Sequence, residues 1–260
     1  MGHVFLGTTL GGRRVAVKVI RPDLTQDPQF KARFAREIEA ARKVNSFYTA
    51  PVVDADPPWM VTAYIPGPSL HSHVADHGPL PENALRRLGA GLAEGLLSVH
   101  AAGLVHRDLK PANVIMVEDG PRIIDFGIAR AVDASALTAH GTIMGTFTYM
   151  SPEQVRGELA GPKSDVFSLA CVLAFAATGH SRFEAPTLPA IVHRVLNTEP
   201  DLTGVPPSVC ALIVHCLAKD QAGRPTVAAV LNELTQPAPA RKASLPPATR
   251  VPSPRDTVSE

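Results

Sequence analysis

Two short polar strings near the middle of the chain hold the residue types that phosphoryl transfer needs. HRDLKPAN occupies residues 106–113, and DFG follows at residues 125–127 after a short apolar run. A carboxylate can orient an attacking hydroxyl and accept its proton, while a lysine steadies the phosphoryl group in transfer. Amide and carboxylate oxygens are ligands that Mg²⁺ prefers. The strings therefore predict two catalytic residues, Asp108 and Lys110, and two metal ligands, Asn113 and Asp125.

The length and spacing of the two strings make them specific. An HRD tripeptide alone occurs by chance, and Asp or Asn in a loop often does no more than cap a turn. The eight-residue string, followed at this spacing by DFG, resembles the eukaryotic-type (Hanks-type) protein kinases, in particular their bacterial Ser/Thr branch. The resemblance implies an α+β fold of two lobes, with a small β-rich N-lobe and a large helical C-lobe. It also implies ATP and Mg²⁺ as cofactors and proteins as substrates.

Hydrophobic periodicity predicts the elements that must position these residues. Before the hinge-like Pro66-Gly67-Pro68 we expect strands at 15–20, 51–56 and 59–65 and a helix at 29–45. After it we expect a long amphipathic helix at 81–102 and strands at 114–117 and 122–124, between the two strings. Further helices are predicted at 163–178, 187–196, 207–218 and 226–234.

A lysine at the end of the first predicted strand is a candidate phosphate ligand. By the kinase resemblance, Lys18 in VAVK grips the α- and β-phosphates, and Glu37 in the following helix positions it. Glu39 lies about 200° around the helix from Glu37, so it cannot take the same role. Taken without the downstream strings, the lysine and the glutamate would be ordinary surface charges.

The segment WMVTAYIPG, residues 59–67, resembles the last N-lobe strand and the hinge of a kinase. The resemblance places Thr62 at the gatekeeper position and the backbone of residues 63–65 at the adenine edge. Apolar residues from both lobes would cover the ring, although each could instead belong to the core alone. The residues expected to contact the nucleotide are Gly2, Val4, Ala16, Lys18, Ala63, Tyr64, Ile65, Asn113, Ile115 and Asp125.

Residues 125–153 resemble an activation segment that ends in SPE. The resemblance implies a buried ion pair between Glu153 and Arg224, and a structural Asp165 that accepts hydrogen bonds from the catalytic-loop backbone. Thr146 would bond Asp108 and Lys110. This threonine and the lysine of HRDLKPAN both favour Ser/Thr over Tyr substrates by the same resemblance.

The activation segment is also rich in threonine. In kinases with an arginine before the catalytic aspartate, a phosphate on this loop often neutralises that arginine and orders the segment. We therefore expect autophosphorylation of Thr138 and Thr142, since Thr146 is committed to the site. The alternative is that the loop is simply polar.

The resemblance begins inside the Gly-rich loop, because the family's first strand and first two glycines have no counterpart before Gly2. This predicts weakened ATP binding and an open sheet edge beside Leu6. Either Met1 is an internal methionine of a longer protein or the kinase is degraded. The rival function is an ATP-binding or scaffolding pseudokinase, which the intact Lys18, Asp108 and Asp125 disfavour. A small-molecule phosphotransferase such as an aminoglycoside kinase would lack the SPE segment.

The composition sets the remaining limits. A chain of 260 residues, 45% of them hydrophobic, has room for one catalytic domain at 1–235, with lobes at 1–65 and 66–235. The net charge of +1 implies no nucleic-acid partner. The longest apolar stretch, 166–177, is too short to span a membrane and is expected to be a helix buried on all sides. Three cysteines without a CxxC pair suit a cytoplasmic location. Residues 236–260 are expected to be a disordered Pro/Ser/Thr-rich tail, and the family resemblance allows a homodimer through the N-lobe.

Overall fold

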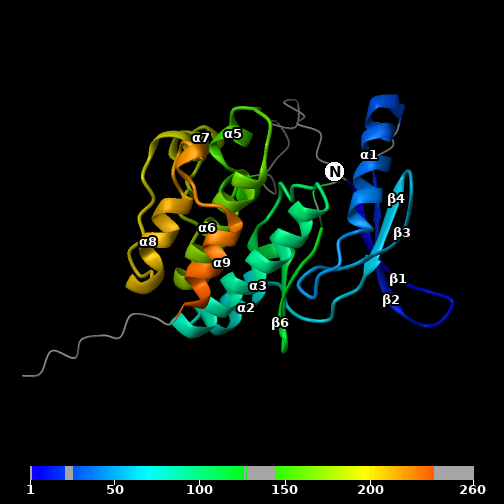
Figure 1. The fold of residues 1–260 in the computed structure, drawn as a ribbon, viewed down its shortest axis with the longest axis horizontal. Coiled ribbons are helices and arrows are strands. Elements are labelled where there is room, and N and C mark those ends of the chain that lie inside the picture. Colours follow the sequence, from blue (N-terminus) through cyan, green and yellow to red (C-terminus); the bar gives the residue numbers. More distant parts are fainter. Residues whose placement is uncertain (1, 21–25, 126, 128–143, 237–260) are drawn as a thin grey trace, which may run out of the picture.

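The computed structural model describes residues 2–20, 26–125, 127 and 144–236, and it divides them into two lobes (Figure 1). A four-stranded sheet and helix α1 (Pro28–Ala41) form the N-lobe. The helices that follow β4 form the C-lobe, and a two-stranded hairpin lies between them and the sheet. The lobes of the predicted kinase-like fold are therefore both present.

The N-lobe sheet is antiparallel, with its strands in the order β1-β2-β4-β3. In this register Lys18 of β2 lies opposite Met60 of β4, at the centre of the sheet. Strand β2 is paired with a strand on each side, so the side chain of Lys18 extends from a rigid part of the backbone. The strands are β1 (His3–Thr8), β2 (Arg14–Val19), β3 (Val52–Asp56) and β4 (Trp59–Ala63).

Helix α1 covers this sheet with one apolar face. Asp27 caps its first turn by accepting a hydrogen bond from the Gln29 amide at 2.9 Å, and Pro28 occupies the first helical position. The residues it buries recur at helical spacing: Phe30, Phe34, Ile38 and Ala41. The helix was predicted to reach residue 45 but ends at Ala41, where a tight turn through residues 42–44 redirects the chain.

Strand β1 is paired on one side only within the described part of the chain. Leu6 lies opposite Ala16 of β2, so it does not lack a strand partner. The open sheet edge that was predicted beside it is present, because the outer edge of β1 has no strand partner among the described residues. Side chains on this strand are largely exposed: Val4 61%, Phe5 56% and Leu6 63%.

The C-lobe is built around a helix that is buried on all sides, as the uniformly apolar sequence predicted. In α6 (Pro162–Thr178) every residue from Ser164 to Ala177 is buried. The other elements are α2 (Leu70–His77), α3 (Glu82–Ala101), β5 (Val114–Val117), β6 (Gly120–Ile123), α4 (Met144–Phe147), α5 (Pro152–Val155), α7 (Leu188–Asn197), α8 (Pro207–Cys216) and α9 (Val227–Thr235).

The cysteines lie in this helical core. Cys171 and Cys216 are buried, and Cys210 is half-buried. Burial raises the pKa of the Cys171 thiol well above its usual range and that of Cys216 to about 12. Both buried thiols therefore stay protonated near neutral pH and act as small apolar groups.

Helix α2 was not predicted. Ser69 caps its first turn, with its hydroxyl accepting from the Ser72 amide at 3.1 Å, and the helix buries Leu70 and Val74. Two buried positions in eight residues are too few to produce a visible helical period, and three histidines obscured them.

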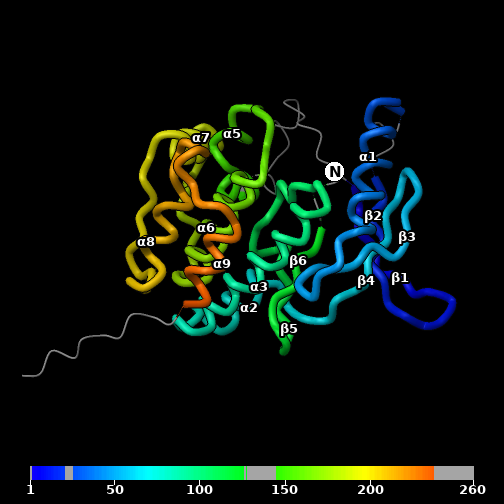
Figure 2. Tube along the Cα trace, in the orientation of Figure 1, coloured from blue at the N-terminus to red at the C-terminus, as the bar shows by residue number. Residues whose placement is uncertain are grey.

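Two segments attach the N-lobe to the β5–β6 hairpin (Figure 2). Before β3, the Tyr48 carbonyl accepts from the Ile123 amide at 2.7 Å, and the Ala50 amide donates to the Ile123 carbonyl at 2.9 Å. After β4, the Pro68 carbonyl accepts from the Met116 amide at 2.9 Å. A Cβ at Gly67 would lie 2.5 Å from the Met116 carbonyl oxygen, so this close approach requires glycine.

Candidate active site

The first polar string forms a compact hydrogen-bonded loop after α3. The Lys110 ammonium lies 3.0 Å from Asp108 Oδ2 and 3.2 Å from the Thr146 hydroxyl. The Asn113 amide nitrogen donates to the Asp108 carbonyl at 2.8 Å and to its carboxylate at 3.2 Å. Carboxylate, lysine, amide and hydroxyl are thus brought together. The predicted contact of Thr146 with Lys110 is present, and its contact with Asp108 stays a prediction.

The backbone of this loop is held in an unusual conformation at Arg107. Its φ is +62°, a region that non-glycine residues rarely adopt. Asp165, fully buried at the start of α6, accepts from the His106 amide at 2.8 Å and from the Arg107 amide at 2.9 Å. The predicted structural role of Asp165 is confirmed. Its Oδ2 also lies 2.7 Å from His100 Nε2, which ties α3 to the same carboxylate.

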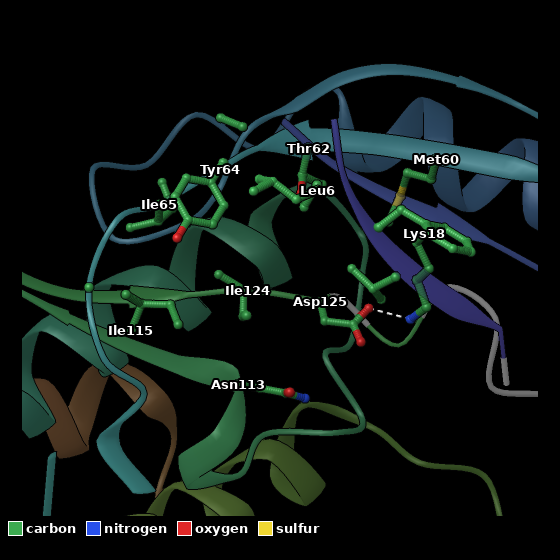
Figure 3. Close-up of a pocket in the computed structure, with 15 residues that line it drawn as sticks. Leu6, Lys18, Met60, Thr62, Tyr64, Ile65, Asn113, Ile115, Ile124 and Asp125 are labelled. Carbon is green, nitrogen blue, oxygen red and sulfur yellow. Dashed lines mark hydrogen bonds and ion pairs between the residues drawn. The ribbon is translucent and has the colours of Figure 1, made fainter. Parts of the chain in front are cut away.

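A cavity of about 360 Å³ lies between the lobes, next to the catalytic loop (Figure 3). Most of the predicted nucleotide contacts line it, from the sheet, the hinge and the β5–β6 hairpin. The lining is mainly apolar at the hinge end and polar at the other, where the charged Lys18 and Asp125 lie with Asn113. The predicted residues found there are Val4, Ala16, Lys18, Thr62, Ala63, Tyr64, Ile65, Asn113, Ile115 and Asp125.

Some predicted and observed lining residues differ. Gly2 is not among the lining residues: a Cβ there would lie 1.6 Å from the Val19 carbonyl oxygen, so this glycine packs against the end of β2. The prediction that it contacts the nucleotide finds no support in this arrangement. The cavity-lining residues that were not predicted from the sequence are Phe5, Leu6, Met60, Gly67 and Ile124. Strand alternation could have found two, because Leu6 shares a face with Val4, and Met60 with Thr62.

The predicted ion pair between Lys18 and Glu37 is not formed. The Lys18 ammonium contacts the Asp125 carboxylate instead, as Figure 3 shows. Glu37 Oε1 lies 2.7 Å from Arg107 Nη1. Spacing along the chain places Glu37 on the helix next to Lys18 but does not fix which cation that helix approaches, so the functional pairing of the two stays a prediction.

Two oxygen donors at the charged end of the cavity fit a hard cation. The Asn113 amide nitrogen donates to Asp108, so the other side-chain atom, Oδ1, can serve as a metal ligand. Asp125 supplies a carboxylate that lines the same cavity. An amide oxygen with a carboxylate is a donor set that suits Mg²⁺, which takes its remaining ligands from water and phosphate oxygens.

The predicted buried ion pair is confirmed. Arg224 donates to both oxygens of Glu153, at 2.8 and 2.9 Å, and Ser164 donates to Glu153 Oε1 at 2.6 Å. Burial opposes ionisation, but the hydrogen bonds from Arg224 and Ser164 outweigh it and lower the pKa of Glu153 to about 2. The pair fixes α5, which follows the segment that carries Thr146. Thr138 and Thr142, the predicted phosphorylation sites, lie outside the described residues.

Residues 1–234 match the protein kinase domain family. The chain belongs to the protein kinase family. This kinase chain is 52% identical over 239 residues to a probable serine/threonine-protein kinase, PkwA, of Thermomonospora curvata, covering 90% of the chain and 32% of that protein. It is 50% identical over 239 residues to the serine/threonine-protein kinase AfsK of Streptomyces coelicolor, covering 90% of the chain and 30% of the relative.

A more distant relative is the serine/threonine-protein kinase PknL of Mycobacterium tuberculosis, 34% identical over 255 residues, with 94% of the chain and 63% of that protein covered. The kinase chain therefore spans about a third of the length of its two more similar relatives. The predicted membership of the bacterial Hanks-type branch and the predicted two-lobed fold are both confirmed. In the described part of the kinase, none of the helices has the length and apolar character needed to cross a membrane.

Proposed function

We propose that the chain is a serine/threonine protein kinase domain that transfers the γ-phosphoryl group of ATP to Ser or Thr hydroxyls of proteins. The observation that carries the proposal is the network joining Asp108, Lys110, Asn113 and Thr146 beside the inter-lobe cavity. Relatives at about half identity bear serine/threonine kinase names, which supports the same class.

On the substrate side, Asp108 orients the attacking hydroxyl and accepts its proton as the new bond to phosphorus forms. Its Oδ2 atom accepts hydrogen bonds from both Lys110 and Asn113, so few orientations are open to the carboxylate. Lys110 lies within reach of the same carboxylate and stabilises negative charge on the transferring group. Thr146 connects the segment that would bind the protein substrate to this lysine.

On the nucleotide side, the apolar part of the cavity holds the adenine ring, with the backbone of residues 63–65 at its edge. Lys18 binds the α- and β-phosphates, and Asn113 and Asp125 hold Mg²⁺, which neutralises phosphate charge when bound. To do so, Lys18 and Asp125 must exchange their mutual contact for these partners. Glu37 then becomes the partner of Lys18.

We also propose sites of autophosphorylation, a contact with a second copy and a location for this chain. Thr138 and Thr142 are the proposed autophosphorylation sites. The exposed β1 edge of the N-lobe is the proposed contact for a second copy, which sedimentation at several concentrations would test. A cytoplasmic location is proposed from the free, mostly buried cysteines.

The test of the proposed function is the intact mass of the purified chain before and after incubation with Mg-ATP, with the variant Asp108→Asn alongside. We expect phosphate to be added to the wild-type chain alone. A generic basic protein substrate with radiolabelled ATP gives a second readout. Equal phosphorylation by the Asp108→Asn variant would refute the catalytic assignment. Nucleotide binding without transfer by the wild-type chain would favour the pseudokinase.

A further inference from the structure

The side chain of Gln154, in the short helix α5, links two loops that meet at the active site. Its amide nitrogen donates to the Arg107 carbonyl at 2.9 Å. Its amide oxygen accepts from the Ser151 backbone amide and from the Ser151 hydroxyl, both at 3.1 Å. Residue 154 thus joins the end of the activation segment to the peptide bond immediately before Asp108.

That peptide bond lies in a strained turn. The Asp108 amide donates to the His106 carbonyl at 2.8 Å, two residues back, with Arg107 at a φ of +62° between them. A γ-turn of positive φ is rare and strained, and such a conformation persists only where the surroundings hold it. Asp165 holds the turn from the amide side of Arg107, at 2.9 Å.

Gln154 holds the same turn from the carbonyl side. The carbonyl it bonds belongs to the peptide that ends at the Asp108 Cα, so the orientation of this peptide sets the direction in which the Asp108 side chain leaves the backbone. We propose that Gln154 is a positioning residue that fixes Asp108 for phosphoryl transfer. The inference rests on the proposed function and deepens it.

The chemistry of both partners requires an amide at this position. The Ser151 backbone N–H can only donate, so it needs an oxygen, and the Arg107 carbonyl can only accept, so it needs an N–H. Glutamine supplies both from one planar group. A glutamate of the same length would keep the contact with Ser151, where Glu is equally suited to a capping box, and would lose the contact with Arg107.

The neighbouring residue shows that this role is separate from the packing of α5. Glu153 points into the C-lobe core, where Arg224 and Ser164 hold it. Gln154, one position on, points to the catalytic loop. Substitution at residue 154 can therefore disturb the loop while the ion pair continues to anchor the helix.

The decisive variant is Gln154→Glu, compared with Gln221→Glu, which adds the same charge at an exposed position of the C-lobe. We expect the kcat of Gln154→Glu to fall about tenfold, which is the change in rate that the loss of one hydrogen bond produces. We expect the KM for ATP and the melting temperature to stay near those of the wild type. The ratio of variant to wild-type kcat should rise as the pH is lowered, because a protonated carboxyl group can again donate to the Arg107 carbonyl.

Hydrogen exchange provides a readout that does not depend on activity. We expect amide exchange in the peptide spanning residues 104–112 to be faster in Gln154→Glu and unchanged in Gln221→Glu. The inference would be overturned if Gln154→Glu had the same kcat and the same amide exchange as the wild type. It would also be overturned if its kcat fell together with its melting temperature and the fall did not depend on pH. If the wild-type chain transfers no phosphate, the proposed function fails, and the exchange data alone decide whether Gln154 holds the loop.

Discussion

Glu37 Oε1 and Arg107 Nη1 lie 2.7 Å apart, so the carboxylate of helix α1 is bonded to the catalytic loop, while Lys18 is bonded to Asp125. In this arrangement the groups proposed to hold phosphate and metal neutralise one another. A nucleotide brings anionic phosphates that can replace Asp125 at the lysine, and a cation can replace the lysine at Asp125. Ligand binding and the exchange of ion-pair partners are therefore linked.

This linkage predicts the effect of neutralising Glu37. In the Glu37→Gln variant, Lys18 would gain no charged partner from α1 when it turns to the phosphates. We expect kcat/KM for ATP to fall at least about tenfold, a loss of roughly 1.4 kcal/mol of transition-state stabilisation. Steady-state kinetics would measure it. Glu39→Gln is the matched control, because Glu39 is on the same helix and its side chain is 68% exposed. Equal losses in both variants would show a general effect of charge.

The metal assignment predicts the effect of Asp125→Asn. Replacing the carboxylate by an amide leaves two neutral donors, so Mg²⁺ should bind more weakly. Metal ions contribute several kcal/mol of charge stabilisation, so we expect a rate at least about a hundredfold lower at millimolar Mg²⁺. A titration of activity against Mg²⁺ would check this. Asp76→Asn, on the exposed surface of α2, should behave as the wild type. An unaltered Mg²⁺ dependence in Asp125→Asn would remove Asp125 from the metal site.

The Glu153–Arg224 pair predicts a pH dependence of stability. The pKa of Glu153 is lowered from 4.5 to about 2. The stabilisation from ionised Glu153 is therefore fully present above pH 4.5 and is lost as the pH falls toward 2. Glu153→Gln leaves a buried guanidinium without its carboxylate, which should cost about 3–5 kcal/mol at neutral pH.

Urea unfolding at several pH values between 3 and 7 would measure both effects. The difference in the free energy of unfolding between wild type and Glu153→Gln should shrink as the solution is acidified. Glu118→Gln, in the exposed turn between β5 and β6, is the control and should be nearly neutral throughout. A difference that is constant with pH would mean that ionised Glu153 is not the source of the stabilisation.

The glycines of α3 predict a packing effect at the junction of the lobes. A Cβ at Gly91 would lie 2.8 Å from Pro121 Cγ and 2.9 Å from Tyr48 Cε1, and both rings are stiff. Overpacking of this kind costs about 1–3 kcal/mol, which exceeds the gain of about 1 kcal/mol that alanine brings to a helix.

Differential scanning calorimetry of Gly91→Ala should therefore show a melting temperature lower by about 2–4 °C. The exposed Glu94→Ala on the same helix is the control and should change it little. A higher melting temperature in Gly91→Ala would show that Tyr48 can move aside at no cost.

The sequence was sufficient to predict those features that depend on local spacing. HRDLKPAN places Asp108, Lys110 and Asn113 within one turn-rich loop, so their mutual contacts follow from the string. Helices with an apolar face, such as α1 and α3, were found within a few residues of their true ends. The uniformly apolar run of α6 correctly indicated burial on all sides.

Features that depend on tertiary placement could not be predicted in the same way. The partner of Glu37 depends on how closely α1 approaches the catalytic loop, which packing decides and spacing does not. Gln154 stands three residues after Ser151, which is a capping-box pattern, but that pattern predicts only its contact with Ser151 and not its contact with the Arg107 carbonyl. The short helix α2 was not predicted because its buried face consists of two residues.

Two segments of the N-lobe side of the chain are bonded to the same small hairpin. The segment at Tyr48 and Ala50 bonds to Ile123 of β6, and the segment at Pro68 bonds to Met116 of β5. These are backbone hydrogen bonds, whereas two other polar links between the lobes, Lys18 with Asp125 and Glu37 with Arg107, are made by side chains. Ile115 and Ile124, which line the cavity, lie beside the bonded residues of the hairpin. A ligand that contacts either isoleucine therefore touches a residue whose direct neighbour, Met116 or Ile123, fastens the hairpin to the N-lobe backbone.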